Sequence, residues 1–419
     1  MFVPLRDRPY QLFISYAHEE RKFVVALAAW LAQVADVRIW WDEDRLPVAS
    51  SVSYSLPEAM GQARGIIIVV SRASVRSGWV REECAAAIGQ RAADPAFRIL
   101  AVKIDDVEIP KPLETTVYIN MPESGLTAET AYRLLCALHT DATTVSPKDA
   151  NDLYVSRTWR SSESGPADEI CSAFAGSGYR LVGDSIDQQR ADRATRVGSI
   201  IRSCGALLAI MPLRDARGRT SPYILEEVGI AQSLGLPYLL VADPGVVVPE
   251  GLTEDAMDGR VYRTDELANF SVLAQAVDAV REYYEPPRTP DYAFYAGSLS
   301  NPANEHVCGL IRAVTGMDCV MGQYLHEQQA QRAIIERISH ARFVVADVSE
   351  DNRNALIEAG IARGANRPLI LMAHGRPQPS RFMFRDLETN FYEDEVEMLG
   401  KLYRLVHPYR KRILNYELG

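Results

Sequence analysis

The 419-residue chain is 47% hydrophobic and 24% charged, a composition typical of soluble globular proteins with two to four domains. With 45 basic and 55 acidic residues its formal net charge is −10, which disfavours a general DNA-binding role. The six cysteines and seven histidines show neither CxxC nor HExxH spacing, so we predict reduced thiols and no metal site. No secretory signal or apolar run of bilayer length is found, and we therefore expect a cytoplasmic protein without a membrane partner.

The first 90 residues predict alternating strands and helices. Strands are expected at residues 10–15, 37–41 and 66–71, and helices at about 21–31, 54–63 and 78–88. This alternation is typical of a parallel α/β sheet, in which the carboxyl ends of the strands share one edge. Such folds usually bind ligands at that edge, so polar residues that directly follow a strand are the first candidates for a site.

Trp79 and Glu83 are the most informative residues of this region. Their four-residue spacing places an indole and a carboxylate one turn apart on the same face of a helix. Because the helix follows the strand at 66–71, the pair is expected near the carboxyl edge, where it could stack a base and hold ribose hydroxyls. The alternative is structural: a half-buried Trp, with a Glu that is favoured by the dipole at the start of a helix.

Four motifs in a fixed order resemble a TIR domain of the bacterial type. They are residues 13–16 (FISY), 39–42 (IWWD), 69–71 (VVS) and the spaced pair within 77–83 (SGWVREE). The resemblance covers roughly residues 8–122 and implies a flavodoxin-like parallel sheet within a domain at 1–145. One departure is in the loop after the second strand, where residues 46–51 (LPVASS) lack the usual glycine.

Many TIR domains cleave NAD at the nicotinamide–ribose bond, so the resemblance implies that NAD is a substrate and that no separate cofactor is needed. It assigns catalysis to Glu83, whereas Glu82 points about 100° away around the helix. The walls of the pocket are then expected to be Ser15, Tyr16, Trp41, Asp42 and Trp79. Trp41 could instead be core packing, and Asp42 could simply begin a loop.

The rest of the chain contains an internal repeat. Residues 225–231 (LEEVGIA) are echoed by 356–362 (LIEAGIA), and Pro237 is echoed by Pro368 at the same offset. Residues 200–210 similarly match 335–345, each as a helix, a turn and a buried strand. We therefore predict two tandem Rossmann-like α/β units, at 150–285 and 290–419, separated by a proline-rich join.

The unit at 290–419 resembles the nucleoside 2-deoxyribosyltransferase family and its Rossmann-like relatives. The matching residues are 341–348 (ARFVVADV), Asn352, Asn354 and 358–362 (EAGIA). The resemblance implies that Glu358 would attack a sugar, with Asp347 close by. The unit at 150–285 keeps Glu227 but has Met211-Pro212 where the aspartate would stand, so we expect binding without turnover. A structural alternative is that the motif glycine lets the helix pack closely on the sheet.

The whole architecture resembles bacterial anti-phage effectors in which a TIR domain is joined to a tandem CARF-like, or SAVED, nucleotide sensor. The resemblance implies that a cyclic nucleotide activates NAD cleavage and that activation assembles the chain into homo-oligomers or filaments. Candidate sensor residues are Arg157, Arg160, Ser298, Asn301, Asp347, Asn354 and Glu358. Two alternatives remain: a TIR scaffold without turnover, and a nucleoside hydrolase or transferase that uses Glu358.

Overall fold

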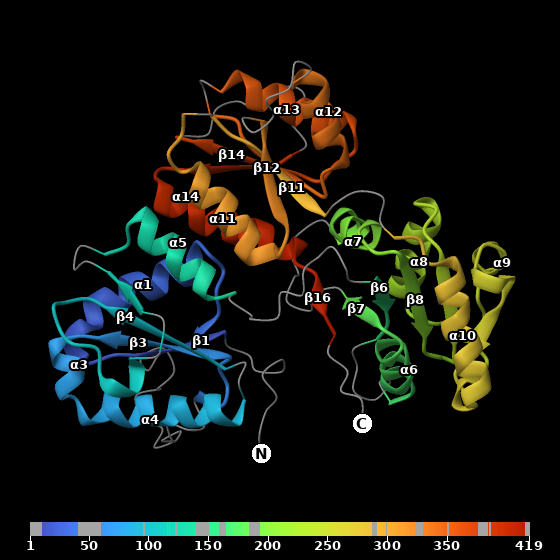
Figure 1. The fold of residues 1–419 in the computed structure, drawn as a ribbon, viewed down its shortest axis with the longest axis horizontal. Coiled ribbons are helices and arrows are strands. Elements are labelled where there is room, and N and C mark those ends of the chain that lie inside the picture. The colour runs from blue at the N-terminus through green and yellow to red at the C-terminus, as the bar shows by residue number, and fades with distance from the viewer. Residues whose placement is uncertain are drawn as a thin grey trace.

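The computed structural model of the chain contains three α/β units, each built on a parallel or mostly parallel sheet (Figure 1). This confirms the predicted fold class. No helix in the part of the chain that it describes is long and apolar enough to cross a membrane. The structure describes residues 11–40, 60–94, 97–114, 116, 118–121, 125–139, 151–158, 165–183, 193–286, 291–298, 300–322, 330–349, 352–375, 384 and 387–414.

The N-terminal unit has a parallel five-stranded sheet in the order β2-β1-β3-β4-β5. Its strands are β1 (Leu12–Ser15), β2 (Ile39–Trp40), β3 (Gly65–Val70), β4 (Arg98–Lys103) and β5 (Tyr118–Asn120). Its helices are η2 (His18–Glu20), α1 (Arg21–Gln33), α3 (Arg72–Arg76), α4 (Gly78–Ala93), η3 (Lys111–Leu113) and α5 (Ala128–Ala137).

The central strand β3 is apolar throughout because helices cover both of its faces. Its sequence GIIIVV is buried at all six positions. Side chains alternate between the faces: Ile67 and Val69 pack in the same cluster as α1, whereas Ile66, Ile68 and Val70 pack in the cluster that contains α4. Functional side chains can therefore reach the crevice above this sheet from two opposite helical layers.

The second unit has a six-stranded sheet in the order β10-β9-β8-β6-β7-β16. Its strands are β6 (Asn151–Ser156), β7 (Tyr179–Gly183), β8 (Ala206–Met211), β9 (Tyr238–Ala242), β10 (Val261–Arg263) and β16 (Arg412–Ile413). Its helices are α6 (Gly165–Gly176), α7 (Arg193–Arg202), α8 (Pro222–Ser233), α9 (Glu250–Thr253), η6 (Met257–Gly259), η7 (Glu266–Ala268) and α10 (Phe270–Tyr283). The edge strand β16 is antiparallel to β7 and comes from the far end of the chain.

The third unit has a parallel five-stranded sheet in the order β12-β11-β13-β14-β15. Its strands are β11 (Tyr292–Ala296), β12 (Asp318–Met321), β13 (Val344–Asp347), β14 (Leu369–His374) and β15 (Thr389–Tyr392). Its helices are α11 (Asn304–Thr315), α12 (Ala330–His340), α13 (Arg353–Gly364), α14 (Glu395–Val406) and η10 (His407–Tyr409). The repeat predicted from sequence thus corresponds to equivalent strand–helix successions in the second and third units.

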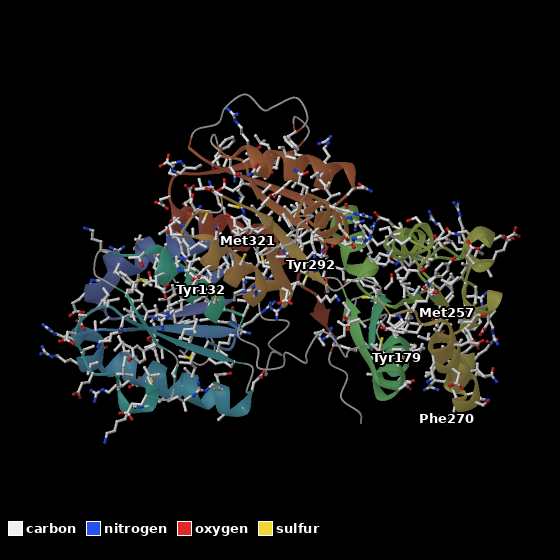
Figure 2. The ribbon with its side chains drawn as sticks, turned by 45° about the horizontal axis from the view of Figure 1, so that its top comes forward. Tyr132, Tyr179, Met257, Phe270, Tyr292 and Met321 are labelled. Atoms are coloured by element: carbon white, nitrogen blue, oxygen red, sulfur yellow. The ribbon has the colours of Figure 1, made fainter. Side chains whose placement is uncertain are left out.

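The N-terminal unit packs directly on the third unit. Helix α5 lies alongside α11 and α14 (Figure 1), and one hydrophobic cluster includes buried residues of both units. Tyr132 of α5, labelled in Figure 2, stacks on His306 of α11 with ring centroids 4.8 Å apart. Gly400 of α14 lies against α1, where a Cβ atom would come within 2.7 Å of Val34 Cγ1. A shared apolar core therefore joins these two units.

Candidate active site in the N-terminal unit

The candidate site lies where the strand order of the first sheet reverses. The chain passes from β1 to β2 on one side and returns to β3 on the other, so β1 and β3 are neighbours at the switch point. Their carboxyl ends open into the crevice where doubly wound α/β sheets bind ligands. The side chains at this edge are therefore the candidates for substrate binding and catalysis.

Glu83 and Ser15 meet at this edge. Ser15 ends β1 on the same face as Phe13, and Glu83 comes from the second turn of α4, which packs on that face. The Ser15 hydroxyl donates a hydrogen bond to Glu83 Oε2. Both side chains are nearly fully buried, with Glu83 only 3% exposed. A buried carboxylate in the switch-point crevice is suited to stabilising a developing positive charge.

The start of α4 is fixed by its own sequence. Ser77 has extended backbone geometry and caps the helix, because its hydroxyl oxygen accepts the backbone N–H of Val80 at 3.4 Å. With the helix starting there, the neighbour Glu82 faces solvent while Glu83 faces the sheet. The structure thus separates the two adjacent glutamates as their helical spacing predicts.

The remaining predicted pocket residues are only partly described. Tyr16 is half-buried and directly follows β1. The backbone of Trp79 lies in the first turn of α4, and its side chain is outside the described residues. Trp41, Asp42 and the loop at 42–51 also lie outside the described residues. Their part in the site stays a prediction.

A second carboxylate at this edge was missed by the sequence reasoning. Glu20, at the end of η2, is 8% exposed, and its Oε1 accepts a hydrogen bond from the hydroxyl of Ser71, directly after β3. Its Oε2 is buried without a hydrogen-bond partner. The signal in the sequence is a serine at the carboxyl end of each of two neighbouring strands, Ser15 at the end of β1 and Ser71 directly after β3, but it does not predict their acidic partners.

Comparison with known proteins agrees with this geometry, because residues 12–136 match the TIR domain family. The N-terminal unit is a TIR domain. A curated relative, "NAD(+) hydrolase TcpA" of Theionarchaea archaeon (strain DG-70-1), is 28% identical over 74 residues, which are 18% of this chain. The match spans 22% of that relative's length. A solved TIR domain of the Toll-related receptor TRR-2 from Hydra magnipapillata is 16% identical, with a TM-score of 0.23, over 27% of this chain and 85% of that one.

Outside the TIR domain, the third unit brings Asp347 and Glu358 to the carboxyl edge of its own sheet. Asp347 ends β13, where its Oδ2 accepts a hydrogen bond from the Tyr392 hydroxyl at 2.9 Å and its Oδ1 accepts one from Ser349 at 2.5 Å. Burial raises the pKa of Glu358, on α13, to about 7. Tyr295, at the neighbouring strand β11, has a buried hydroxyl without a hydrogen-bond partner.

The structure describes four of the other predicted sensor residues, Arg157, Ser298, Asn301 and Asn354. Arg157 is buried and forms an ion pair with Asp168 at 2.6 Å. Asn301 Oδ1 accepts the backbone N–H of Ala303 at 2.9 Å, which makes it part of a local turn. Ser298 is half-buried, Asn354 is exposed, and Arg160 lies outside the described residues. Among the described side chains, no group of three His, Cys, Asp or Glu residues is placed to hold a metal ion.

The motif glycine of the second unit does not serve close packing. A Cβ atom built on Gly229 would meet no heavy atom within 4 Å. The structural explanation that a glycine is needed there for the helix to approach the sheet is therefore wrong at this position. Glu227, two residues earlier, is 7% exposed, and Met211 occupies the strand end that carries the aspartate in the third unit.

Proposed function

We propose that the TIR domain cleaves NAD at the nicotinamide–ribose bond and that Glu83 is the catalytic carboxylate. The observation that carries this proposal is the placement of Glu83, buried and bonded to Ser15, at the carboxyl edge of β1 and β3. The name of the curated relative, an NAD(+) hydrolase, supports the same reaction.

The chemistry requires little beyond one charge and good positioning. Nicotinamide leaves as a neutral base from a cationic nucleotide, so the enzyme mainly stabilises an oxocarbenium-like sugar. The Glu83 carboxylate would supply the negative charge opposite that centre. Ser15 would hold the carboxylate until a ribose hydroxyl replaces it as the hydrogen-bond donor.

The burial of Glu83 favours a resting state of low activity. At 3% exposure the carboxylate is covered, so we expect this edge to open before catalysis. We propose that a cyclic nucleotide bound by the two C-terminal units, acting as a SAVED- or CARF-like sensor, drives that opening and assembles the chain into oligomers or filaments. The shared core of α5, α11 and α14 supports this coupling, because it joins the third unit to the TIR domain. A role in anti-phage defence by depletion of NAD follows from this proposal.

The test incubates the purified full chain with NAD and a panel of cyclic nucleotides, and measures the release of nicotinamide. We expect slow release from the chain alone and a large increase with one member of the panel. A chain that releases no nicotinamide under any condition would leave the TIR domain as a scaffold without turnover.

A second candidate function rests on Glu358 and Asp347 in the third unit. Burial raises the pKa of the Glu358 carboxyl to about 7, and two hydroxyls fix Asp347 at the end of β13. Carboxyl groups held in this way are suited to attack on a nucleoside sugar. This hypothesis predicts release of free base from nucleosides or deoxynucleosides, which chromatography detects. Loss of that release in Glu358→Gln, with NAD cleavage unchanged, would assign it to this site.

A further inference from the structure

The Ser71 hydroxyl both donates and accepts a hydrogen bond. Ser71 caps α3: its oxygen accepts the backbone N–H of Ser74 at 2.9 Å, and Ser74 Oγ accepts the backbone N–H of Ser71 at 2.7 Å. A serine hydroxyl has a single proton, and that of Ser71 goes to Glu20. The Glu20 carboxylate therefore fixes the orientation of the group that starts α3.

Ser71 and Glu83 are connected by two helices, α3 and α4, with no loop between the helices. Helix α3 is five residues long, and its C-cap, Ser77, is also the N-cap of α4. The backbone N–H of Ser77 bonds to the carbonyl of Ala73 at 3.0 Å. A shift at Ser71 is thus carried through two directly joined helices to the second turn of α4.

The two serine–glutamate pairs approach the sheet from opposite layers. Glu20 follows β1 and leads into α1, whereas Glu83 comes from α4. The side-chain alternation of β3 places Ser71 on the α1 face, since Val69, two residues earlier, packs in the cluster of α1. The Glu20–Ser71 bond therefore ties the α1 layer to the origin of the helix that carries Glu83.

From this geometry we infer that Glu20 is a positioning residue of the TIR-domain site, which holds Glu83 in place through Ser71 and the α3–α4 pair. The inference rests on the proposed NAD cleavage for its kinetic readout. Glu20 acts on Glu83 through its hydrogen bond to Ser71, and its second oxygen is buried without a hydrogen-bond partner. Ser71 needs a hydrogen-bond acceptor at this position and not a negative charge. A glutamine, which has a neutral acceptor oxygen and the same shape, should therefore substitute for Glu20.

The experiment compares Glu20→Ala and Glu20→Gln with Glu19→Ala, the exposed neighbour, as the matched control. We expect kcat for nicotinamide release to fall by about tenfold or more in Glu20→Ala with KM little changed, since small misplacements of a catalytic group are costly. Glu20→Gln and Glu19→Ala keep near-normal kcat. Loss of kcat in Glu20→Gln equal to that in Glu20→Ala would overturn the inference in favour of a role for the charge.

A double variant tests the route. Glu20 has Ser71 as its hydrogen-bond partner, so Glu20→Ala should change kcat no further in a Ser71→Ala background. A further loss in the double variant, as large as in the single one, would show that Glu20 acts by another path and would overturn the inference.

Hydrogen exchange separates this inference from the proposed function. If the wild-type chain cleaves no NAD, the NADase proposal fails, and the backbone amides of residues 71–83 still report on positioning. We expect these amides to exchange faster in Glu20→Ala than in Glu19→Ala. Equal exchange in the two variants would overturn the positioning role whatever the activity.

Discussion

Lys411 Nζ lies 2.9 Å from Asp152 Oδ2, although the two residues are 259 positions apart in the chain. The same ammonium is 2.9 Å from Asp291 Oδ2, so one cation bridges the first strand of the second unit to the start of the third. Arg180 and Arg342 complete the group by pairing with Asp152 and Asp291. Lys411 directly precedes β16. The C-terminal segment therefore joins the two repeat units both through this charge and through the pairing of β16 with β7.

Replacement of Lys411 by Met should remove this ion-pair bridge between the second and third units. Asp152 and Asp291 are largely buried and lose a shared counterion, so we expect the free energy of unfolding to fall by about 3 kcal/mol. Denaturant unfolding of the full chain measures the change. Lys103→Met is the control, because Lys103 is 4.0 Å from the fully exposed Asp106 and should change stability by less than about 0.5 kcal/mol. Equal effects of the two variants would contradict the role of the bridge.

Glu83→Gln should abolish NAD cleavage while the chain stays folded. The amide keeps the shape and helix propensity of the side chain but removes the charge opposite the ribosyl cation. We expect a loss of at least about a hundredfold in kcat, or about 2.7 kcal/mol of transition-state stabilisation. Nicotinamide release measures it, and Glu82→Gln is the exposed control. A dead Glu82→Gln beside an active Glu83→Gln would show that the wrong carboxylate was chosen.

Gly400→Ala should disturb the contact between the TIR domain and the third unit. The added Cβ would meet Val34 Cγ1 at 2.7 Å and Trp30 Cζ2 at 3.2 Å, so the packing between α14 and α1 must shift. We expect weaker activation of nicotinamide release by the nucleotide, with nucleotide affinity retained. Gly229→Ala is the matched control, since its Cβ meets nothing within 4 Å, and the gain in helix propensity should stabilise the chain by about 0.5–1 kcal/mol. Normal activation of Gly400→Ala would argue against this route of coupling.

Glu358 should make stability depend on pH. Burial raises its pKa from 4.5 to about 7 in the folded chain, so its protonated form stabilises the fold below pH 4.5 and this contribution is lost as the pH rises to about 7. In Glu358→Gln the group cannot ionise. We therefore expect the Tm of the variant, relative to wild type, to increase between about pH 4.5 and 7 and then to level off. A pH-independent difference in Tm, by calorimetry, would contradict the burial of an ionisable Glu358.

Activation should depend on protein concentration if assembly completes the TIR site. Two non-identical α/β units in one chain suit a head-to-tail contact, which forms open filaments unless the rotation closes a ring. A nucleotide that binds the assembly preferentially would stabilise it. We expect light scattering to increase when the activator is added, and specific activity to rise steeply with enzyme concentration. Full activity of a monomer in sedimentation under assay conditions would contradict assembly and leave NAD cleavage standing.

The sequence by itself determined the elements that depend on local patterns. Continuous apolar runs such as 66–70 and 206–210 predicted buried strands, because a strand covered on both faces has no polar side. The repeat of LEEVGIA in LIEAGIA predicted two equivalent units, and the helical geometry predicted that Glu82 and Glu83 point in different directions. Each of these patterns lies within a few helical turns or a single strand.

Only the tertiary structure decided the contacts between segments far apart in the chain. The partners of Glu83 and Glu20 are serines 68 and 51 positions away, and no local pattern pairs them. The two-residue strand β16 is too short to have a periodicity, so its place at the edge of the second sheet depends on β7 and Lys411. The packing of α5 on α11 and α14 likewise depends on the complementary shapes of apolar surfaces, which composition and spacing do not specify.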